Sequence, residues 1–206
     1  LAHLGVLFLD ELPEFSRPVL EALRQPLEDG VITISRASGS VQLPARFQLV
    51  AASNPCPCGY HGSTDDSHQC TCPPAAVLRY QRRLSGPLLD RLDLRVNVAR
   101  LTEEELLAAA PGESSAAVAA RVVSARNLAL ERQGVPNAYL SGRELTANTA
   151  VAGASQAVLG RIVRSLRPSA RGLDRLLRVA RTAADLNNST VVGAEHLLEA
   201  SGYRGG

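Results

Sequence analysis

Gly5-Val6-Leu7-Phe8-Leu9-Asp10-Glu11 is a short apolar run that ends in two adjacent carboxylates. Such a run is typical of a strand that is buried on both faces in the middle of a parallel sheet. Ligands of open α/β sheets bind beyond the carboxyl ends of the strands, so the two acids stand where chemistry is expected. The pattern predicts a Walker B element, with Asp10 in the shell of a Mg²⁺ ion and Glu11 orienting the water in phosphoryl transfer. The alternative is a core strand that runs into an acidic turn.

The length and composition of the chain limit the classes of protein to which it can belong. Its 206 residues suffice for one large domain or two small ones. It has no apolar run as long as a membrane span and no leader with a cleavage site, so we expect a cytoplasmic protein without a membrane segment. Met is absent and the chain starts inside a strand-like run, which suggests that an N-terminal part is missing.

All 22 basic residues are Arg. A phosphate-binding loop of the form GxxxxGK(S/T) needs a Lys that reaches the β and γ phosphates, so this chain does not contain one. If Asp10 and Glu11 are a Walker B pair, the nucleotide cradle lies upstream of residue 1. We therefore expect this chain to be unable to hydrolyse ATP alone.

A helix and a β-hairpin are predicted after the acidic pair. Ser16 fits the N-cap of a helix, which Pro26 should kink or stop before Gly30. Residues 31–35 and 40–43 then alternate apolar and polar side chains around a turn that contains glycine, which is the signature of a hairpin. This hairpin is either functional or a surface element without a role.

A second buried strand is predicted over residues 47–52, and it stops just before Asn54. At the end of a central strand, the amide of Asn54 can bind the attacking water or the γ phosphate. Asn is also a common turn former before proline, and Pro55 follows it here. The neighbouring acidic strand favours the first interpretation.

All four cysteines lie in one loop, as two CxC pairs that eleven residues separate: Cys56, Cys58, Cys70 and Cys72. Four thiolates in two close pairs can bind a tetrahedral Zn²⁺ and fix a loop that has little core of its own. The usual spacing is CxxC, so free thiols are the alternative, whereas disulfides are disfavoured in a cytoplasmic protein. We interpret His61 and His68 as bystanders, because four sulfurs complete the shell.

The segment that follows is basic and ends in an acidic cluster. A helix is predicted over residues 75–84, and residues 95–98 alternate like a strand. Arg91 lies between Asp90 and Asp93, where it is either an arginine finger for a neighbouring subunit's nucleotide or part of a surface salt-bridge cluster.

The second half of the sequence predicts helices only, over roughly 114–133, 155–166, 169–186 and 193–200. A change of composition near Arg100 predicts a domain boundary. Arg171 stands at the start of one helix, where a guanidinium can close a helical lid onto phosphates. Arg175 and Arg178 share its face, and we interpret them as solvated charges.

In series, these motifs resemble the AAA+ ATPases and, more narrowly, the magnesium-chelatase-like ComM (YifB) family. The segments that carry the resemblance are residues 5–15, 33–37, 54–59 and 85–91. It extends over essentially the whole chain and implies an α/β fold. Residues 1–100 would form the later part of an AAA+ core, with a parallel sheet, flanking helices, the hairpin and a Cys-rich loop at 54–74. Residues 101–206 would form an all-α lid.

The resemblance also implies roles for single residues. Asp10 and Glu11 match the family's Walker B acids, Asn54 its sensor 1, Arg91 its trans-acting finger and Arg171 its sensor 2. ATP and Mg²⁺ are the implied cofactors of this P-loop NTPase, whose Walker A loop lies outside the chain.

The resemblance implies partners as well. ComM proteins are similar to hexameric helicases that drive branch migration of DNA in natural transformation, so a homo-oligomeric ring and DNA are expected. The segment 31–46 matches the hairpin that faces the pore of related ring helicases, and we name Arg36 and Arg46 as candidates for contact with DNA phosphates. The alternative function is a magnesium-chelatase-type chaperone that remodels a protein partner.

Overall fold

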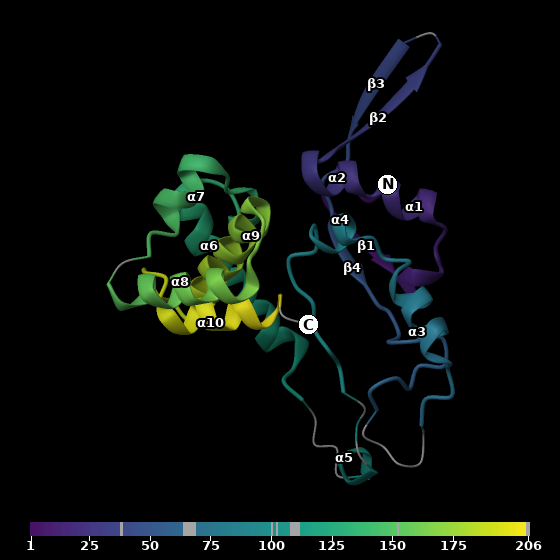
Figure 1. Cartoon of the computed structure of the whole chain (residues 1–206). Helices are drawn as coiled ribbons and strands as arrows, with labels where there is room; N and C mark the ends of the chain where they lie inside the picture. Colours follow the sequence, from purple (N-terminus) through teal and green to yellow (C-terminus); the bar gives the residue numbers. More distant parts are fainter. Residues whose placement is uncertain are drawn as a thin grey trace. The chain divides into compact units, whose positions relative to one another are not determined.

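The fold consists of a mixed α/β part followed by a helical part, as predicted (Figure 1). The structure is a computed structural model that describes residues 1–37, 39–63, 69–99, 101, 103–107, 112–151 and 153–204. The chain divides into two compact units, Leu1–Leu92 and Asp93–Gly206. The boundary that the sequence predicts, Arg100, lies outside the described residues.

The predicted parallel strands form a two-stranded sheet in the first unit. Strand β1 (Val6–Leu9) pairs in parallel with β4 (Gln48–Ala51), so that Leu9 lies opposite Ala51. Backbone hydrogen bonds continue one step beyond the strands, since the N–H of Ala52 donates to the carbonyl of Leu9 over 3.0 Å. The carboxyl ends of β1 and β4 therefore lie side by side at the same end of the sheet, called here the common edge.

The predictions that β1 is buried on both faces and that β4 is a buried strand are both wrong. In β4, Val50 is 40% exposed and only Leu49 is partly buried. Val6 and Phe8 are each 60% exposed, while Leu7 and Leu9 are partly buried. Successive side chains of a strand point to opposite faces. Leu9 packs against the cluster of Leu12, Leu20 and Leu88, whereas the face that carries Val6 and Phe8 has no such cover within the described part of the chain.

The predicted helix after the acidic pair is split into two. A 3₁₀ turn, η1 (Leu12–Glu14), precedes α1 (Arg17–Ala22) and α2 (Arg24–Asp29). Pro26 has no N–H to donate to the carbonyl four residues earlier, which explains why the helix is interrupted at Leu23. Gly30, with φ of 69°, ends α2 in the left-handed conformation that glycine adopts readily.

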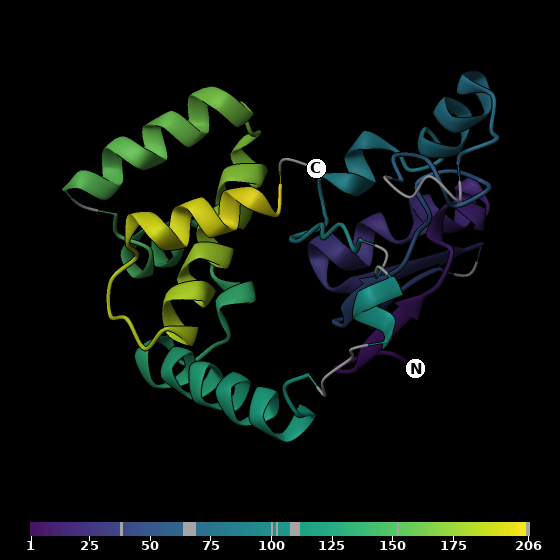
Figure 2. The ribbon, with the colours of Figure 1, turned by 90° about the horizontal axis from the view of Figure 1, so that it is seen from below.

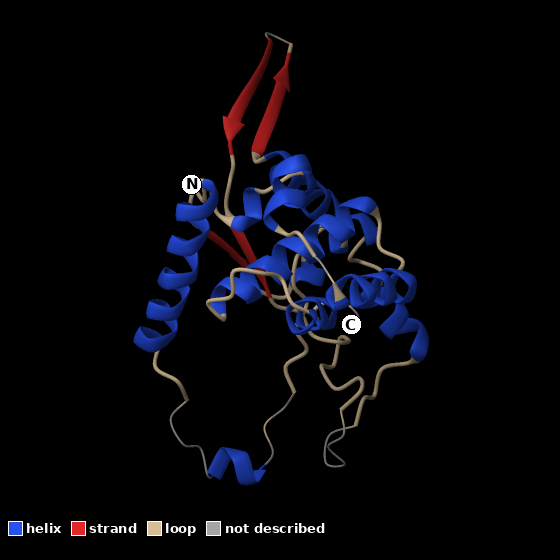
Figure 3. Cartoon of the chain, turned by 90° about the vertical axis from the view of Figure 1, so that its left-hand side faces the viewer, coloured by secondary structure: helices blue, strands red, loops and turns tan. Residues whose placement is uncertain are grey.

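The predicted hairpin is confirmed. Strand β2 (Val31–Arg36) pairs antiparallel with β3 (Gly39–Pro44), and the pair projects from α2 (Figures 1 and 3). The turn includes Ser38, which lies outside the described residues. One face of the hairpin carries two apolar cross-strand pairs, all of whose side chains are exposed: Ile32 with Leu43, and Ile34 with Val41.

Two short helices complete the first unit, α3 (Pro74–Gln81) and α4 (Gly86–Leu89). The second unit contains α5 (Glu103–Leu107), α6 (Ser115–Gln133), η2 (Asn137–Tyr139), α7 (Gly142–Asn148), α8 (Ala154–Leu166), α9 (Ala170–Leu186) and α10 (Ala194–Gly202). The four long helices match the predicted ranges to within two residues, whereas η2 and α7 were not predicted. No described helix is long and apolar enough to cross a membrane.

Helix α9 is at the centre of the second unit, because it packs against α6, η2, α7 and α10 (Figure 2). Its apolar stripe forms one core with residues of α8, α10 and the segment before α10: Val158, Ile162, Leu176, Ala180, Ala184, Val192, Leu197 and Ala200. This core holds together the helices of the segment that the sequence predicts to be an all-α lid.

Two predictions for this region are wrong. Residues 95–98 form no strand, since the N–H of Arg95 bonds to the carbonyl of Tyr203 and no described strand pairs with the segment. Arg175 is not a solvated charge: it is buried, and its Nη1 lies 2.9 Å from Oδ1 of Asp93. Arg178 is half-buried, and burial followed by the positive charge of Arg175 lowers its pKa.

Candidate functional site

Asp10 and Glu11 follow β1 directly, and both are exposed. Glu11 adopts a left-handed conformation with φ of 49°, and its N–H donates to Oδ1 of Asp10 over 2.9 Å. A left-handed residue other than glycine costs about 1–2 kcal/mol. The N–H of Leu12 then donates to the carbonyl of Ala52 over 2.9 Å, directly after β4. The acidic pair is thus a sharp turn whose backbone is anchored to β4.

Asn54 follows β4 by three residues and is also exposed. Because β1 and β4 are parallel and end opposite each other, the two acids and Asn54 leave the sheet at the same edge. A Cβ placed on Gly59 would lie 4.0 Å from Oδ1 of Asn54, so the next turn of the chain folds back beside this amide. Two carboxylates and one amide oxygen are the kind of donors that Mg²⁺ prefers.

Arg91 lies just after α4 and is held within its own unit. Its Nη1 donates to the carbonyl of Pro87 over 2.6 Å, and its Nη2 contacts the carboxylate of Glu28 on α2. Asp93, which is near Arg91 in sequence, pairs with Arg175 instead. Glu28 could not be identified from the sequence as the partner of Arg91, because no local pattern links α2 to the segment after α4.

Arg171 is the second residue of α9 and is exposed. The N-cap of this helix is Ser169, whose Oγ accepts a hydrogen bond from the N–H of Gly172 over 3.0 Å. The guanidinium is therefore carried by the first turn of α9, the helix at the centre of the second unit, which fixes its backbone position.

The structure does not bring Arg36 and Arg46 together. Arg36 is the last residue of β2, at the tip of the hairpin, while Arg46 follows the base of β3. The six-residue strands separate these ends by roughly 17 Å. The side chain of Arg46 lies against Gly30, where an added Cβ would come within 2.8 Å of its Cγ.

The four cysteines lie together, as the sequence predicts. Their Sγ atoms are within 4.8 Å of one another, and all four are free thiols. Sγ of Cys56 lies 3.4 Å from that of Cys58 and 3.7 Å from that of Cys70. A tetrahedral zinc site with Zn–S bonds of about 2.3 Å has sulfurs about 3.8 Å apart, so the cluster fits this metal closely. His61 contributes no atom to the cluster, and His68 lies outside the described residues.

The thiols of this cluster differ in how readily they ionise. A hydrogen bond from the backbone of Tyr60 lowers the pKa of Cys58 to about 6. Burial raises the pKa of Cys72 to about 12. A metal ion binds thiolates, so a cation at the centre of the cluster would offset the cost of ionising these thiols.

Sequence reasoning missed the contacts of α3 with this site. Nη1 of Arg83, just beyond α3, lies 2.7 Å from Oε2 of Glu14 and 3.0 Å from the carbonyl of Pro13. Gln81 donates to the carbonyl of Pro55 over 3.3 Å. These partners are 26 to 70 residues apart in the chain, so no local spacing indicates them.

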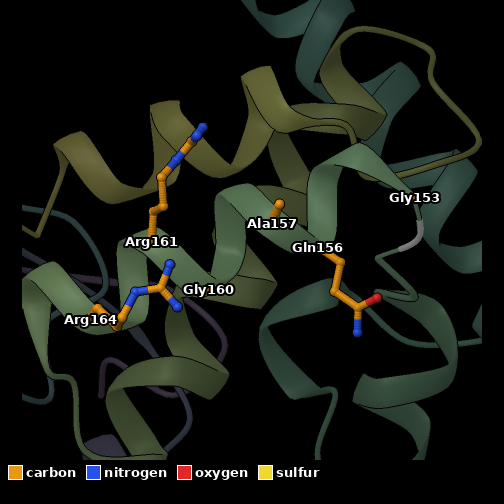
Figure 4. A pocket seen from close by; sticks show the side chains of 6 residues that line it. All are labelled: Gly153, Gln156, Ala157, Gly160, Arg161 and Arg164. Carbon is orange, nitrogen blue, oxygen red and sulfur yellow. The ribbon is translucent and has the colours of Figure 1, made fainter.

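A separate cavity lies on α8, in the second unit. It measures about 600 Å³ and is lined by Gly153, Gln156, Ala157, Gly160, Arg161 and Arg164 (Figure 4). The guanidinium of Arg164 lies near Gly160, where an added Cβ would be 3.4 Å from Nη1. No predicted site residue lines this cavity, so it is not part of the candidate site.

Comparison with known proteins agrees with these observations. Residues 1–106 match the family described as magnesium chelatase, subunit ChlI, and residues 112–204 match the C-terminal domain of the same subunit. The chain is 47% identical over 205 residues to competence protein ComM of Haemophilus influenzae, with 99% of this chain and 40% of ComM covered. It is 45% identical over 206 residues to YifB of Escherichia coli, again with 99% and 40% covered.

The predicted resemblance is therefore confirmed, and the chain spans about 40% of the length of the curated relatives that it matches. The match to the ChlI description includes the strand with the acidic pair, the hairpin, the cysteine loop and the segment of Arg91. This chain belongs to the magnesium chelatase subunit ChlI family and is a homologue of the ComM and YifB proteins.

Proposed function

We propose that this chain is part of an ATP-hydrolysing AAA+ motor subunit. The observation that carries the proposal is the common edge of β1 and β4, at which Asp10, Glu11 and Asn54 leave the sheet. This is the edge at which ligands of α/β sheets bind. Membership of the ChlI family supports the same conclusion.

Each residue has a separate role in this proposal. Asp10 holds Mg²⁺, while Glu11 and Asn54 orient the attacking water. The metal ion, when bound, neutralises charge on the phosphates. Arg91 from a neighbouring subunit stabilises the charge of the transferred group, and Arg171 links hydrolysis to movement of the helical unit.

We place the nucleotide cradle outside this chain. None of its basic residues is a Lys, so the Lys of a Walker A loop must come from another segment of a longer polypeptide. A homohexameric ring of that polypeptide would put Arg91 of one subunit at the nucleotide of the next. We propose that the chain alone hydrolyses no ATP.

DNA is the proposed substrate, moved as in a ComM-like helicase that promotes branch migration during natural transformation. The relative named competence protein ComM supports this assignment. Arg36 at the tip of the hairpin is exposed and can contact a phosphate. We propose a structural Zn²⁺ at the four cysteines, on the fit of their Sγ positions.

A protein substrate is the second candidate, as for a magnesium-chelatase-type chaperone. One observation favours it: the hairpin presents four exposed apolar side chains on one face and a single Arg at its tip. An exposed apolar surface is better suited to grip a polypeptide than a phosphate backbone. DNA binding that weakens steeply with salt would favour the first candidate, because phosphate contacts release counterions.

The motor proposal is tested by Glu11→Gln in the longer polypeptide that carries the nucleotide cradle. This change keeps the size of the side chain and removes the base, so ATP should still bind while steady-state hydrolysis is lost. Glu113→Gln, in the second unit, is the matched control and should hydrolyse ATP at the unsubstituted rate. Hydrolysis at an unchanged rate in Glu11→Gln would falsify the assignment.

A further inference from the structure

Helix α3 contacts both of the segments that carry the proposed catalytic groups. At its carboxyl end, Gln81 donates to the carbonyl of Pro55, the residue after Asn54. Just beyond it, Arg83 binds the carbonyl of Pro13 over 3.0 Å and the carboxylate of Glu14 over 2.7 Å. Pro13 and Glu14 belong to η1, the turn that begins one residue after Glu11.

Tyr80 belongs to the face of α3 that is covered by the rest of the first unit. Its side chain is buried, and burial raises the pKa of its phenol. The negative charges of Glu14 and Glu11 raise this pKa further, whereas the positive charge of Arg83 lowers it.

The cysteine cluster ties α3 to the segment of Asn54 from the other end. Cys56 is fully buried and follows Asn54 by two residues, while Cys72 directly precedes Pro73, the N-cap of α3. Sγ of Cys56 and Sγ of Cys58 lie 3.7 Å and 3.6 Å from that of Cys70. A metal bound by all four sulfurs would hold the two ends of the loop together at the first turn of α3.

The polar contacts of Arg83 add to the packing of α3, in which Val77 and Tyr80 are buried. A cavity of about 920 Å³ lies between α3 and the start of α1, with the exposed side chains of Phe15 and Leu78 among its lining residues. On this side Arg83 links α3 to η1 through its two polar contacts.

We propose that α3, fastened at one end by a Zn²⁺ bound to the four cysteines and at the other by Arg83, braces the turns that carry Asn54 and Glu11 beyond the paired ends of β1 and β4. Arg83 is then a positioning residue, since it touches neither nucleotide nor metal in the proposed site. The inference rests on the proposed function for its catalytic consequence, but its structural part does not. A misplacement of about 1 Å can reduce a rate about 100-fold. Helix α3, attached at both ends, would therefore act as a strut that limits such movement of the two catalytic groups.

The structural part is tested on the 206-residue chain itself. Zinc and iron are counted by mass spectrometry, and one zinc per chain is expected in the unsubstituted protein and in Arg83→Gln, but none in Cys56→Ser. Amide hydrogen exchange is then measured at residues 10–15 and 52–55. Both segments should exchange faster in Arg83→Gln and in Cys56→Ser than in the unsubstituted chain.

Arg82→Gln is the matched control, because Arg82 is adjacent to Arg83 and equally exposed but makes no ion pair in the described part of the chain. It should leave exchange unchanged at both segments. Arg83→Lys should restore part of the protection, since an ammonium can keep one of the two contacts. A chain without bound metal, or faster exchange confined to the loop 56–63 in Cys56→Ser, would overturn the proposal.

The catalytic consequence is measured in the longer polypeptide. We expect Arg83→Gln to lower kcat for ATP by about 10- to 100-fold with little change in KM, and Arg82→Gln to change neither. Failure of the proposed function would give another result, namely an unchanged rate of ATP hydrolysis in Glu11→Gln. An unchanged kcat in Arg83→Gln, with Glu11→Gln inactive, would refute the strut alone.

Discussion

Arg91 and Glu28 form an ion pair between the segment after α4 and helix α2, although 63 residues separate them in the sequence. The side chain of Arg91 is only 11% exposed, and its other terminal nitrogen donates to the carbonyl of Pro87. The guanidinium is thus oriented by its own subunit before any nucleotide binds. If Arg91 acts on a neighbouring subunit, its guanidinium must either reach the phosphate with a nitrogen that Glu28 leaves available or give up Glu28 for the phosphate.

Arg91→Ala is expected to abolish ATP hydrolysis by the longer polypeptide while leaving ATP binding intact. Loss of an arginine finger typically lowers the rate about 10³- to 10⁵-fold. If Arg91 acts in trans as proposed, mixing Arg91→Ala subunits with Glu11→Gln subunits should restore part of the activity. In such a mixture some interfaces combine an intact Glu11 with an intact Arg91. Two inactive variants that stay inactive when mixed would rule out the trans role.

Asp185 is expected to stabilise the helical unit strongly. Its side chain is 2% exposed, and it accepts hydrogen bonds from Arg132, Arg181 and Asn137 over 2.7–3.0 Å. Removing one partner from such a buried group costs about 3–5 kcal/mol. Asp185→Asn should lower the free energy of unfolding, measured with urea, by an amount in this range. Glu131→Gln, at an exposed acid of α6, should change it by less than about 0.5 kcal/mol.

The same carboxylate predicts how stability depends on pH. Burial raises the pKa of Asp185, but the hydrogen bonds of Arg132 and Asn137 and the charge of Arg181 outweigh it, so the pKa is lowered on folding. The contribution of Asp185 is therefore fully present above its unfolded pKa of about 3.9 and is lost as the pH falls through the folded value. The free energy of unfolding, measured with urea, should decrease less between pH 7 and pH 3 for Asp185→Asn than for the unsubstituted chain.

The sequence predicts local features of this protein well and long-range contacts poorly. The apolar runs that end at Asp10 and near Asn54 identify two strands, although not how far those strands are buried, and the CxC pairs identify the cluster because all four thiols lie in one loop. The partner of Arg83 could not be predicted, since Glu14 is one of 20 acidic residues and lies 69 positions away. Arg175 and its partner Asp93 are likewise far apart in the chain, at 82 positions, so the sequence does not indicate that Arg175 is buried.

Gly30→Ala should destabilise the first unit by more than the usual cost of placing an alanine in the left-handed conformation. Gly30 has φ of 69°, and an added Cβ would lie 2.8 Å from Cγ of Arg46. Gly134, which ends α6 with φ of 74°, has no atom within 4 Å of the same position and is the matched site. Gly134→Ala should cost about 1–2 kcal/mol, and Gly30→Ala more, in thermal unfolding of the respective unit. Equal costs would mean that Arg46 moves aside freely.

Arg36→Gln should weaken DNA binding by the longer polypeptide and flatten its salt dependence. Each phosphate contact contributes about 0.9 to the slope of log K against log salt concentration on duplex DNA, so the slope should fall by about 0.9 for every subunit whose contact is lost. Arg46→Gln is the comparison, because Arg46 lies at the base of the hairpin against Gly30 and should matter less. If Ile34→Ser impairs function while Arg36→Gln leaves the slope unchanged, the exposed apolar face is what contacts the substrate, and a protein rather than DNA is the substrate of the motor.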